Sequence, residues 1–441
     1  MNKTPWATGC ALAALAGGCF STDEATIRRH ALAVYAREAQ PAPGAIGHPG
    51  AGPWERVPDD QVLAQCHLDP AALARADAAI KQPWVAIRYG RLCHANAAAE
   101  VMAPEESFSA TKILGAVTSG AVAYQTRDLT RSGRKTGPFS DLDRVDHWLD
   151  HVAYNADAHV AHVLGMVAQS SDIAYGKRVM EYDYTGFVQL DSLDVMLTTA
   201  IAQDPARLGR DLDVFTQEQL FDVLGMTQST WSFGLPNKSF GFGWNTVVLD
   251  MARLGQLILR GGVVNDQRVV DARWIYDLTH PAFEDANTAM GYCTWLNAAD
   301  NFTTGTMPTP PDQDWSDLTA QRRFPGPCAP VAIHREHPHG LSGSPDCGYA
   351  AHSCEQPFDV GVWQSIAGFG SVIQGHPGLD LVLVGWQLTP EDFFGLGASS
   401  LLWDTVRPAI IAADPTYPND EKAFCTAYGQ NHYAPDLNPP H

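Results

Sequence analysis

The pattern of apolar and polar positions along the chain changes several times between strand-like and helix-like segments. Residues 84–92 are an apolar run with a Tyr-Gly pair near its end, which predicts a strand and a turn. Residues 113–124 are apolar over three helical turns, and residues 240–262 begin as a glycine-rich loop and continue as an amphipathic helix. Residues 361–386 predict a hairpin, and a final helix is expected over residues 391–412. The chain therefore mixes strands and helices.

Composition narrows the class of protein. The 441 residues are 45% hydrophobic, which is enough to bury one large core or two subdomains. The net charge of −20 repels a phosphate backbone, so we expect no nucleic-acid partner. No apolar run is long enough to predict a transmembrane helix.

Residues 1–19 have the pattern of a signal peptide or lipoprotein signal. A short apolar segment follows Lys3 and ends in small residues. The Leu-Ala-Gly-Gly sequence before Cys19 resembles a bacterial lipobox with one extra residue. We therefore expect an exported protein, which is periplasmic, anchored to a membrane through a lipid on Cys19, or extracellular. An ordinary cytosolic N-terminus is the alternative.

The cysteines also indicate an oxidising compartment. Seven follow the signal segment, so at least one thiol stays free, and the sequence does not give their connectivity. Cys347 and Cys354 are close enough along the chain to close a small loop. The seven are Cys66, Cys93, Cys293, Cys328, Cys347, Cys354 and Cys425.

A long insertion over residues 297–356 is rich in Pro, Asp and His. It contains His334, His337 and His339, which raises the question of zinc, but their spacing matches no standard zinc site. We therefore predict no metal, and expect a disulfide-stapled loop that covers the active site. Residues 413–441 are predicted to be an irregular tail.

The strongest chemical signal is Ser109 followed by Lys112 at the start of the apolar helix. Residues three apart on a helix are neighbours, so the lysine amine can lie against the serine hydroxyl. A serine needs a base to become a nucleophile, and a lysine serves when its surroundings lower its pKa. The first turn of a helix also favours developing negative charge. The spacing predicts a nucleophile and its base.

Other segments follow Ser109 and Lys112 in a characteristic order. They are Tyr182 with its Thr-Gly-Phe-Val sequel, residues 224–231, the Phe-Gly-Trp loop at 242–244 and the Gly-Phe-Gly turn at 368–370. Together these segments resemble the serine β-lactamase-like superfamily, in the branch of class C β-lactamases, family VIII esterases and 6-aminohexanoate-dimer hydrolases.

The resemblance covers residues 71–412 and implies the architecture. It implies an α/β fold in which an antiparallel sheet is flanked by helices, within a hydrolase domain over residues 55–412. A mainly helical subdomain is expected over about residues 125–245, with the active site between the two parts.

The resemblance also assigns roles to residues. Tyr182 would relay the proton together with Lys112, although it could instead be an interface tyrosine, with Tyr175 and Tyr184 as competitors. The phenol of a tyrosine ordinarily titrates near about 10, so ammonium groups are needed to stabilise a phenolate. Tyr184 itself stands where the family has an asparagine that holds the substrate carbonyl.

The family's third motif, a lysine or histidine followed by glycine on a strand, is missing from residues 362–367. Trp363 could be the relic of a Trp-Gly-Gly version. The strand's main-chain N–H does not depend on side-chain identity, and we expect Ser365 to supply it to an oxyanion hole together with Ser109.

These residues predict a serine hydrolase that cleaves an ester or amide through an acyl-enzyme on Ser109, without a cofactor. Loss of the third-motif cation points to neutral substrates. The alternatives are a β-lactamase or DD-peptidase, whose substrate is a lactam or peptide, and a non-catalytic module that binds cell-envelope material.

Overall fold

The computed structural model describes residues 44–150, 158–168, 187–232, 238–280, 282–283, 290–296, 363–392 and 398–411, and every structural statement below concerns these residues. The predicted signal segment, the insertion at 297–356 and the tail at 413–441 lie outside them. None of the described helices is long and apolar enough to cross a bilayer.

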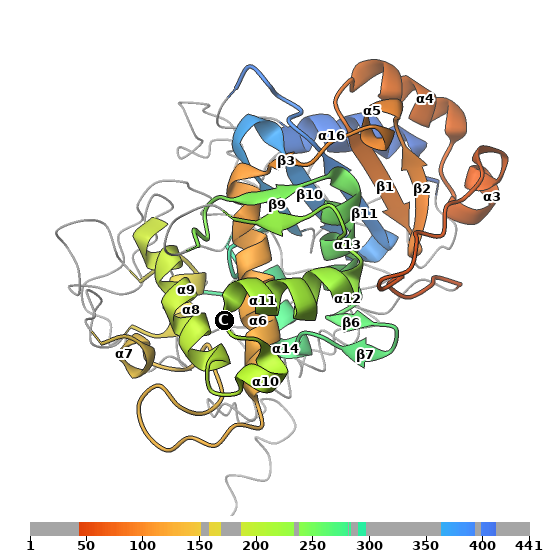
Figure 1. Cartoon of the computed structure of the whole chain (residues 1–441). Helices are drawn as coiled ribbons and strands as arrows, with labels where there is room; N and C mark the ends of the chain where they lie inside the picture. Colours follow the sequence, from red (N-terminus) through yellow and green to blue (C-terminus); the bar gives the residue numbers. More distant parts are fainter. Residues whose placement is uncertain are drawn as a thin grey trace, which may run out of the picture.

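A six-stranded antiparallel sheet forms the centre of the fold (Figure 1). Its strand order is β2-β1-β11-β10-β9-β8, and every pairing in it is antiparallel. This sheet with its flanking helices confirms the predicted fold class. The strands are β1 (Trp84–Arg88), β2 (Arg91–Ala95), β8 (Trp295–Leu296), β9 (Trp363–Ile366), β10 (Val372–His376) and β11 (Leu381–Gly385).

Two small sheets accompany the main one. β5 (Trp244–Thr246) pairs with both β3 (Glu105–Glu106) and β4 (Thr230–Trp231), and β6 (Val263–Val264) pairs with β7 (Gln267–Arg268). The short helical turns are η1 (Asp59–Gln61), η2 (Phe108–Ala110), the π-helical η4 (Gln217–Phe221), η6 (Gly368–Gly370), η7 (Pro377–Leu379) and η8 (Arg407–Ala409).

The α-helices differ in how they begin, and α4 has an ordinary start signal. α4 begins at Pro70, where Asp69 accepts a hydrogen bond from the Ala71 N–H at 2.9 Å. The helices are α3 (Val62–Cys66), α4 (Pro70–Ala79), α5 (Ala97–Glu100), α6 (Thr111–Thr126), α7 (Val145–Trp148), α8 (Val160–Leu164), α9 (Phe187–Ile201), α10 (Pro205–Leu208), α11 (Leu212–Thr216), α12 (Asp222–Leu224), α13 (Val248–Leu259), α14 (Ala272–Thr279) and α16 (Ala398–Val406).

Helices cover both faces of the sheet. α13 packs on one face so closely that a Cβ at Gly255 would lie 2.7 Å from a Val382 methyl. α16 covers the other face, where the His376 ring stacks on Trp403 with centroids 4.3 Å apart. Side chains alternate along a strand, so double coverage explains why β1, β10 and β11 are buried at every position.

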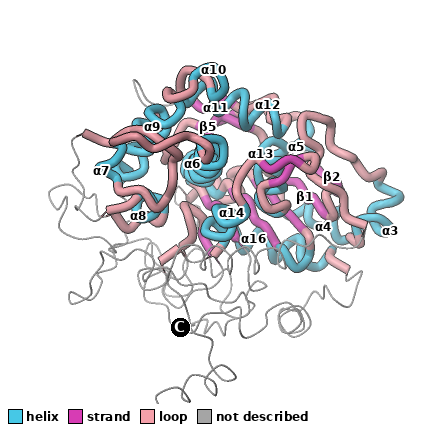
Figure 2. Tube along the Cα trace, turned by 90° about the horizontal axis from the view of Figure 1, so that it is seen from below, coloured by secondary structure: helices cyan, strands magenta, loops and turns pink. Residues whose placement is uncertain are grey.

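α6 has the central sheet on one side and other helices on the opposite side (Figures 1 and 2). Figures 1 and 2 show it between the sheet strands and α8 and α9. Trp274 of α14 donates its indole N–H to the Ala116 carbonyl at 2.9 Å, and Gly120 leaves room for that ring. The apolar pattern over residues 113–124 thus corresponds to a helix buried on nearly all sides.

Several predicted elements differ in detail. The predicted hairpin over residues 361–386 is three strands, because the left-handed Phe369 (φ 59°) turns the chain between β9 and β10. The described part of the predicted last helix spans Ala398–Val406, with η8 after it. The Tyr-Gly turn is present between β1 and β2, with φ of 54° at Tyr89 and 81° at Gly90.

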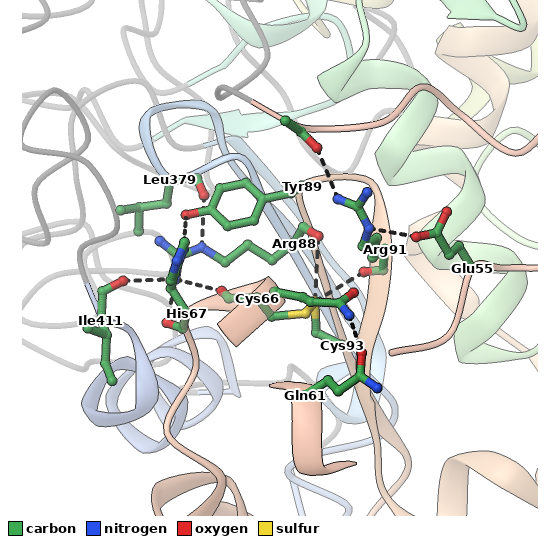
Figure 3. The surroundings of a disulfide bond; sticks show 12 residues. Glu55, Gln61, Cys66, His67, Arg88, Tyr89, Arg91, Cys93, Leu379 and Ile411 are labelled. Carbon is green, nitrogen blue, oxygen red and sulfur yellow. Dashed lines mark hydrogen bonds and ion pairs between the residues drawn. A yellow bond between two sulfur atoms is a disulfide. The ribbon is translucent and has the colours of Figure 1, made fainter. Parts of the chain in front are cut away.

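A disulfide joins Cys66 of α3 to Cys93 of β2 (Figure 3). The sequence did not single out this pair, because its members lie 27 residues apart and are brought together only by packing on the sheet edge. Cys293 is a buried free thiol. The suggested pairing of Cys347 with Cys354 lies outside the described residues.

Candidate active site

Ser109 and Lys112 meet where η2 passes into α6. Lys112 Nζ donates a hydrogen bond to Ser109 Oγ at 2.8 Å. The lysine side chain is almost completely buried, at 3% exposure, whereas Ser109 is half-buried. No side chain caps the N-terminus of α6, which begins two residues after the serine. The two side chains that the spacing predicted to be neighbours are therefore hydrogen-bonded.

The turn before the serine is held by a carboxylate. Phe108 has a left-handed φ of 51°, and its N–H donates to Glu106 Oε1 at 2.8 Å. Glu106 also accepts the Gly243 N–H, at 2.9 Å on Oε1 and 3.1 Å on Oε2. Burial raises the pKa of the Glu106 carboxyl from its ordinary value, and these two N–H donors oppose the rise. The turn that carries Ser109 is thus tied to a loop more than a hundred residues away.

That loop, residues 239–243, packs on α6 beside the lysine. Gly115 leaves room for the Phe240 ring, since a Cβ at Gly115 would lie 2.3 Å from Phe240 Cδ1. The Trp244 N–H donates to Thr111 Oγ1 at 3.2 Å. Between these contacts, the Phe242 ring centroid lies 5.9 Å from Lys112 Nζ, within the range of a cation–π contact.

Asp191 of α9 anchors the other end of the loop. Its carboxylate accepts the Phe240 N–H at 2.8 Å and the Ser239 hydroxyl at 3.1 Å. Burial raises the pKa of Asp191, while these hydrogen bonds and the charge of Lys112 lower it. Asp191 therefore lies within the electrostatic field of the lysine.

The sheet contributes β9, the neighbour of its edge strand β8, to the site. β9 contacts η2, and Ser365, at 2% exposure, lies opposite Ile373 of β10. The Phe108 and Phe369 rings meet edge to face with centroids 5.3 Å apart, which packs the turn after β9 against the turn that carries Ser109. The strand from which an oxyanion donor was predicted therefore runs beside Ser109.

The other predicted residues are not placed. Tyr182 and Tyr184 lie outside the described residues, so the proton relay through Tyr182 stays a prediction. Trp363 is the first residue of β9, but its side chain is not described. Of the predicted set, the structure brings together Ser109 and Lys112 directly and Ser365 through the contact of β9 with η2.

The site contains residues that the sequence analysis missed. Glu106 and Asp191 accept hydrogen bonds from backbone N–H groups of the loop 239–243. Glu106 and Gly243 are 137 residues apart, so no local sequence pattern indicates their contact. Burial raises the pKa of the Cys293 thiol to about 12, and the charge of Lys112 opposes the rise. Its Sγ donates to the Leu164 carbonyl at 3.3 Å. Among the described residues, no group of three or more His, Cys, Asp or Glu side chains is arranged to hold a metal ion.

Comparison with known proteins gives matches to solved structures only. No protein-family model matches the chain, and no curated protein sequence does. A family VIII carboxylesterase is 10% identical, with 80% of this chain and 98% of that one covered and a TM-score of 0.46. A class C β-lactamase is 13% identical (78% and 98% covered, TM-score 0.43), and a β-lactamase from Mycobacterium bovis is 14% identical (76% and 99%, TM-score 0.42). These are structures of the protein class that the sequence motifs resemble.

Proposed function

We propose that this protein is a serine hydrolase that cleaves an ester or amide through an acyl-enzyme on Ser109. The observation that carries the proposal is the 2.8 Å hydrogen bond between Lys112 Nζ and Ser109 Oγ, made by a buried lysine at the start of α6. Because Nζ lies within hydrogen-bond distance of Oγ, this lysine is placed to take the serine proton.

The proposed reaction has two halves. Ser109 Oγ attacks the carbonyl carbon while its proton passes to the neutral Lys112 amine. Main-chain N–H groups of Ser109 and Ser365 hold the oxyanion. Lys112 and Tyr182 return the proton to the leaving group as its bond to the carbonyl carbon breaks. Water then attacks the acyl-enzyme, releases the acid and restores Ser109.

The charges around Ser109 favour a neutral substrate. Glu106 holds the turn that carries Ser109, Asp191 lies within the electrostatic field of Lys112, and the β9 residues 363–366 contain no cation. A substrate carboxylate would meet repulsion from these groups and would lack a partner on the strand. A neutral ester or amide is therefore preferred to a β-lactam with its carboxylate. The β-lactamase or DD-peptidase reading and the non-catalytic binding module remain the competing hypotheses.

The first test is intact mass after exposure to a fluorophosphonate probe and, separately, to a penicillin, with hydrolysis of p-nitrophenyl butyrate followed in parallel. The Ser109→Ala variant is compared with Ser107→Ala, a matched control two residues away in the same turn. We expect one fluorophosphonate adduct and ester turnover in the wild type and the control, and neither in Ser109→Ala. A lasting penicillin adduct would favour the lactam-directed enzyme, and no adduct of either kind would favour the binding module.

We also propose that the protein is exported, either released or tethered through a lipid on Cys19. The signal-like residues 1–19 support this, and so does the Cys66–Cys93 disulfide, since disulfides persist mainly in oxidising compartments. Fractionation of expressing bacteria, with Cys19→Ser beside the wild type, tests it. Membrane association that is lost in Cys19→Ser supports the tether, and full-length protein in the cytosol contradicts export.

A further inference from the structure

We propose that Glu106 is a positioning residue for the proposed nucleophile, because its carboxylate ties the turn that presents Ser109 to the loop 239–243 that lies over Lys112. This inference rests on the proposed function and adds to it a residue that the Ser-x-x-Lys motif does not include. Its role is distinct from that of Ser109 and Lys112, since its carboxylate accepts the backbone N–H groups of Phe108 and Gly243.

The turn at Phe108 needs a contact that stabilises it. A left-handed φ is unfavourable for a bulky residue such as Phe108. The bond from the Phe108 N–H to Glu106 Oε1, at 2.8 Å, stabilises this conformation. Ser109 follows directly, so the direction of its hydroxyl depends on how Phe108 is held.

The loop 239–243 is bound by the same carboxylate. The same Oε1 atom accepts the Gly243 N–H at 2.9 Å, so a single oxygen joins the two segments. Asp191 fixes the opposite end of the loop through the Phe240 N–H. With both ends held by carboxylates, Phe242 is kept 5.9 Å from Lys112 Nζ. Glu106 therefore acts on both members of the Ser109–Lys112 pair.

The consequence is a selective effect on chemistry. Without an acceptor at this place, two partly buried N–H groups lose their partner, and the turn and the loop can move independently. A small misplacement of a nucleophile relative to its base lowers the rate of attack far more than it weakens substrate binding. Removal of the carboxylate should lower the acylation rate constant and leave the binding constants almost unchanged.

The experiment compares Glu106→Leu with Glu106→Gln and uses Glu105→Leu and Glu105→Gln as matched controls, since Glu105 is the exposed neighbour on the same strand. For each variant, fluorophosphonate inactivation is separated into its binding constant and its rate constant, and kcat and KM are measured with p-nitrophenyl butyrate. We expect Glu106→Leu to lower the inactivation rate constant and kcat by about 10- to 100-fold at near-constant binding constant and KM. Glu106→Gln should stay within about 3-fold, because one amide oxygen can still accept both N–H groups.

Several outcomes would overturn the proposal. One is a folded Glu106→Leu variant, shown by an unchanged circular dichroism spectrum, that reacts at the wild-type rate. Another is a loss confined to KM and the binding constant. If Glu106→Leu does not fold, Glu106→Asp takes its place: the shortened carboxylate should slow inactivation, and a wild-type rate contradicts the proposal. If the probe does not label the wild type, the Ser109 assignment is wrong, and this inference is wrong with it. If the probe does label the wild type, the Glu106 variants test this inference alone.

Discussion

Two buried cations, Arg88 and Lys112, show how the same kind of charge is used differently in two regions. Arg88 of β1 is fully buried and donates to four backbone carbonyls: Leu379 at 3.2 Å, Cys66 at 3.1 Å, His67 at 2.8 Å and Ile411 at 3.2 Å (Figure 3). Lys112 is buried to a similar degree, but its amine donates to the hydroxyl of Ser109.

The difference lies in the partner. A carbonyl has no proton to give, so Arg88 can only hold chain segments together, and its guanidinium stays charged. A hydroxyl can lose its proton, and a lysine amine can become neutral and accept it. The disulfide corner around Arg88 is therefore expected to govern stability, and the Ser109 turn to govern reactivity.

The largest effect is expected from Lys112→Met, which keeps an apolar stem but removes the amine. Loss of a general base costs about 10²- to 10⁴-fold in rate, so probe labelling and ester turnover should fall by that factor while the folded state persists. Inactivation kinetics and a thermal melt of the same samples provide the measurement. Turnover within a few fold of wild type would remove Lys112 from the proposed chemistry.

The next effect concerns stability only. Replacing both Cys66 and Cys93 by serine opens a loop of 27 residues, and loop entropy predicts a loss of about 3–4 kcal/mol in the free energy of unfolding. Urea denaturation measures it, and reduction of the wild type should act in the same direction. Labelling of Ser109 per folded molecule should stay unchanged, and a parallel loss of labelling would show that the two regions are not separate.

Arg88→Met tests the structural cation in the same way. The buried Arg88 donates to four carbonyls, and an apolar residue removes these hydrogen bonds, although the His67 carbonyl keeps the Ile411 N–H at 2.9 Å. We therefore expect a loss of about 2–3 kcal/mol in the free energy of unfolding. Urea denaturation measures the free energy of unfolding of this variant. Arg91→Met, which removes a partly exposed arginine on β2, is the control, so the difference between the two variants gives the effect of burial. If Arg88→Met has the same free energy of unfolding as the wild type, water molecules make the hydrogen bonds that the guanidinium made.

The smallest predicted effect concerns the charge of a buried carboxylate, that of Asp194 on α9. Burial raises the pKa of Asp194 to about 6, with the charges of Asp213 and Asp191 adding to the rise and the Lys238 contacts opposing it. The folded protein binds this proton more tightly than the unfolded chain does, so the Asp194 contribution to stability falls as pH rises from about 4 to 6.

Asp194→Asn removes the buried charge, so the variant should gain stability over wild type at pH 7.5 by about 1 kcal/mol, after allowance for screening, and less at pH 5. Urea titrations at the two pH values measure the difference. A gain that does not depend on pH would attribute the effect to side-chain packing instead of ionisation.

The fold and the site differ in how much of them the sequence could predict. Strands at residues 84–92 and helices at 113–124 and 240–262 carry strong local patterns, and the structure has elements at each place. The three-strand arrangement around Phe369 was missed, because a left-handed phenylalanine has no propensity signal and is held by packing on Phe108.

For this protein, the sequence by itself determined what local spacing can encode: the order of strands and helices, and the neighbouring positions of Ser109 and Lys112 on one helical turn. Only the tertiary structure decided that Cys66 pairs with Cys93, and that Glu106 and Asp191 hold the loop beside the lysine. The physical reason is that a helix fixes its neighbours at a spacing of three or four residues, whereas contacts across more than a hundred residues depend on how whole elements pack.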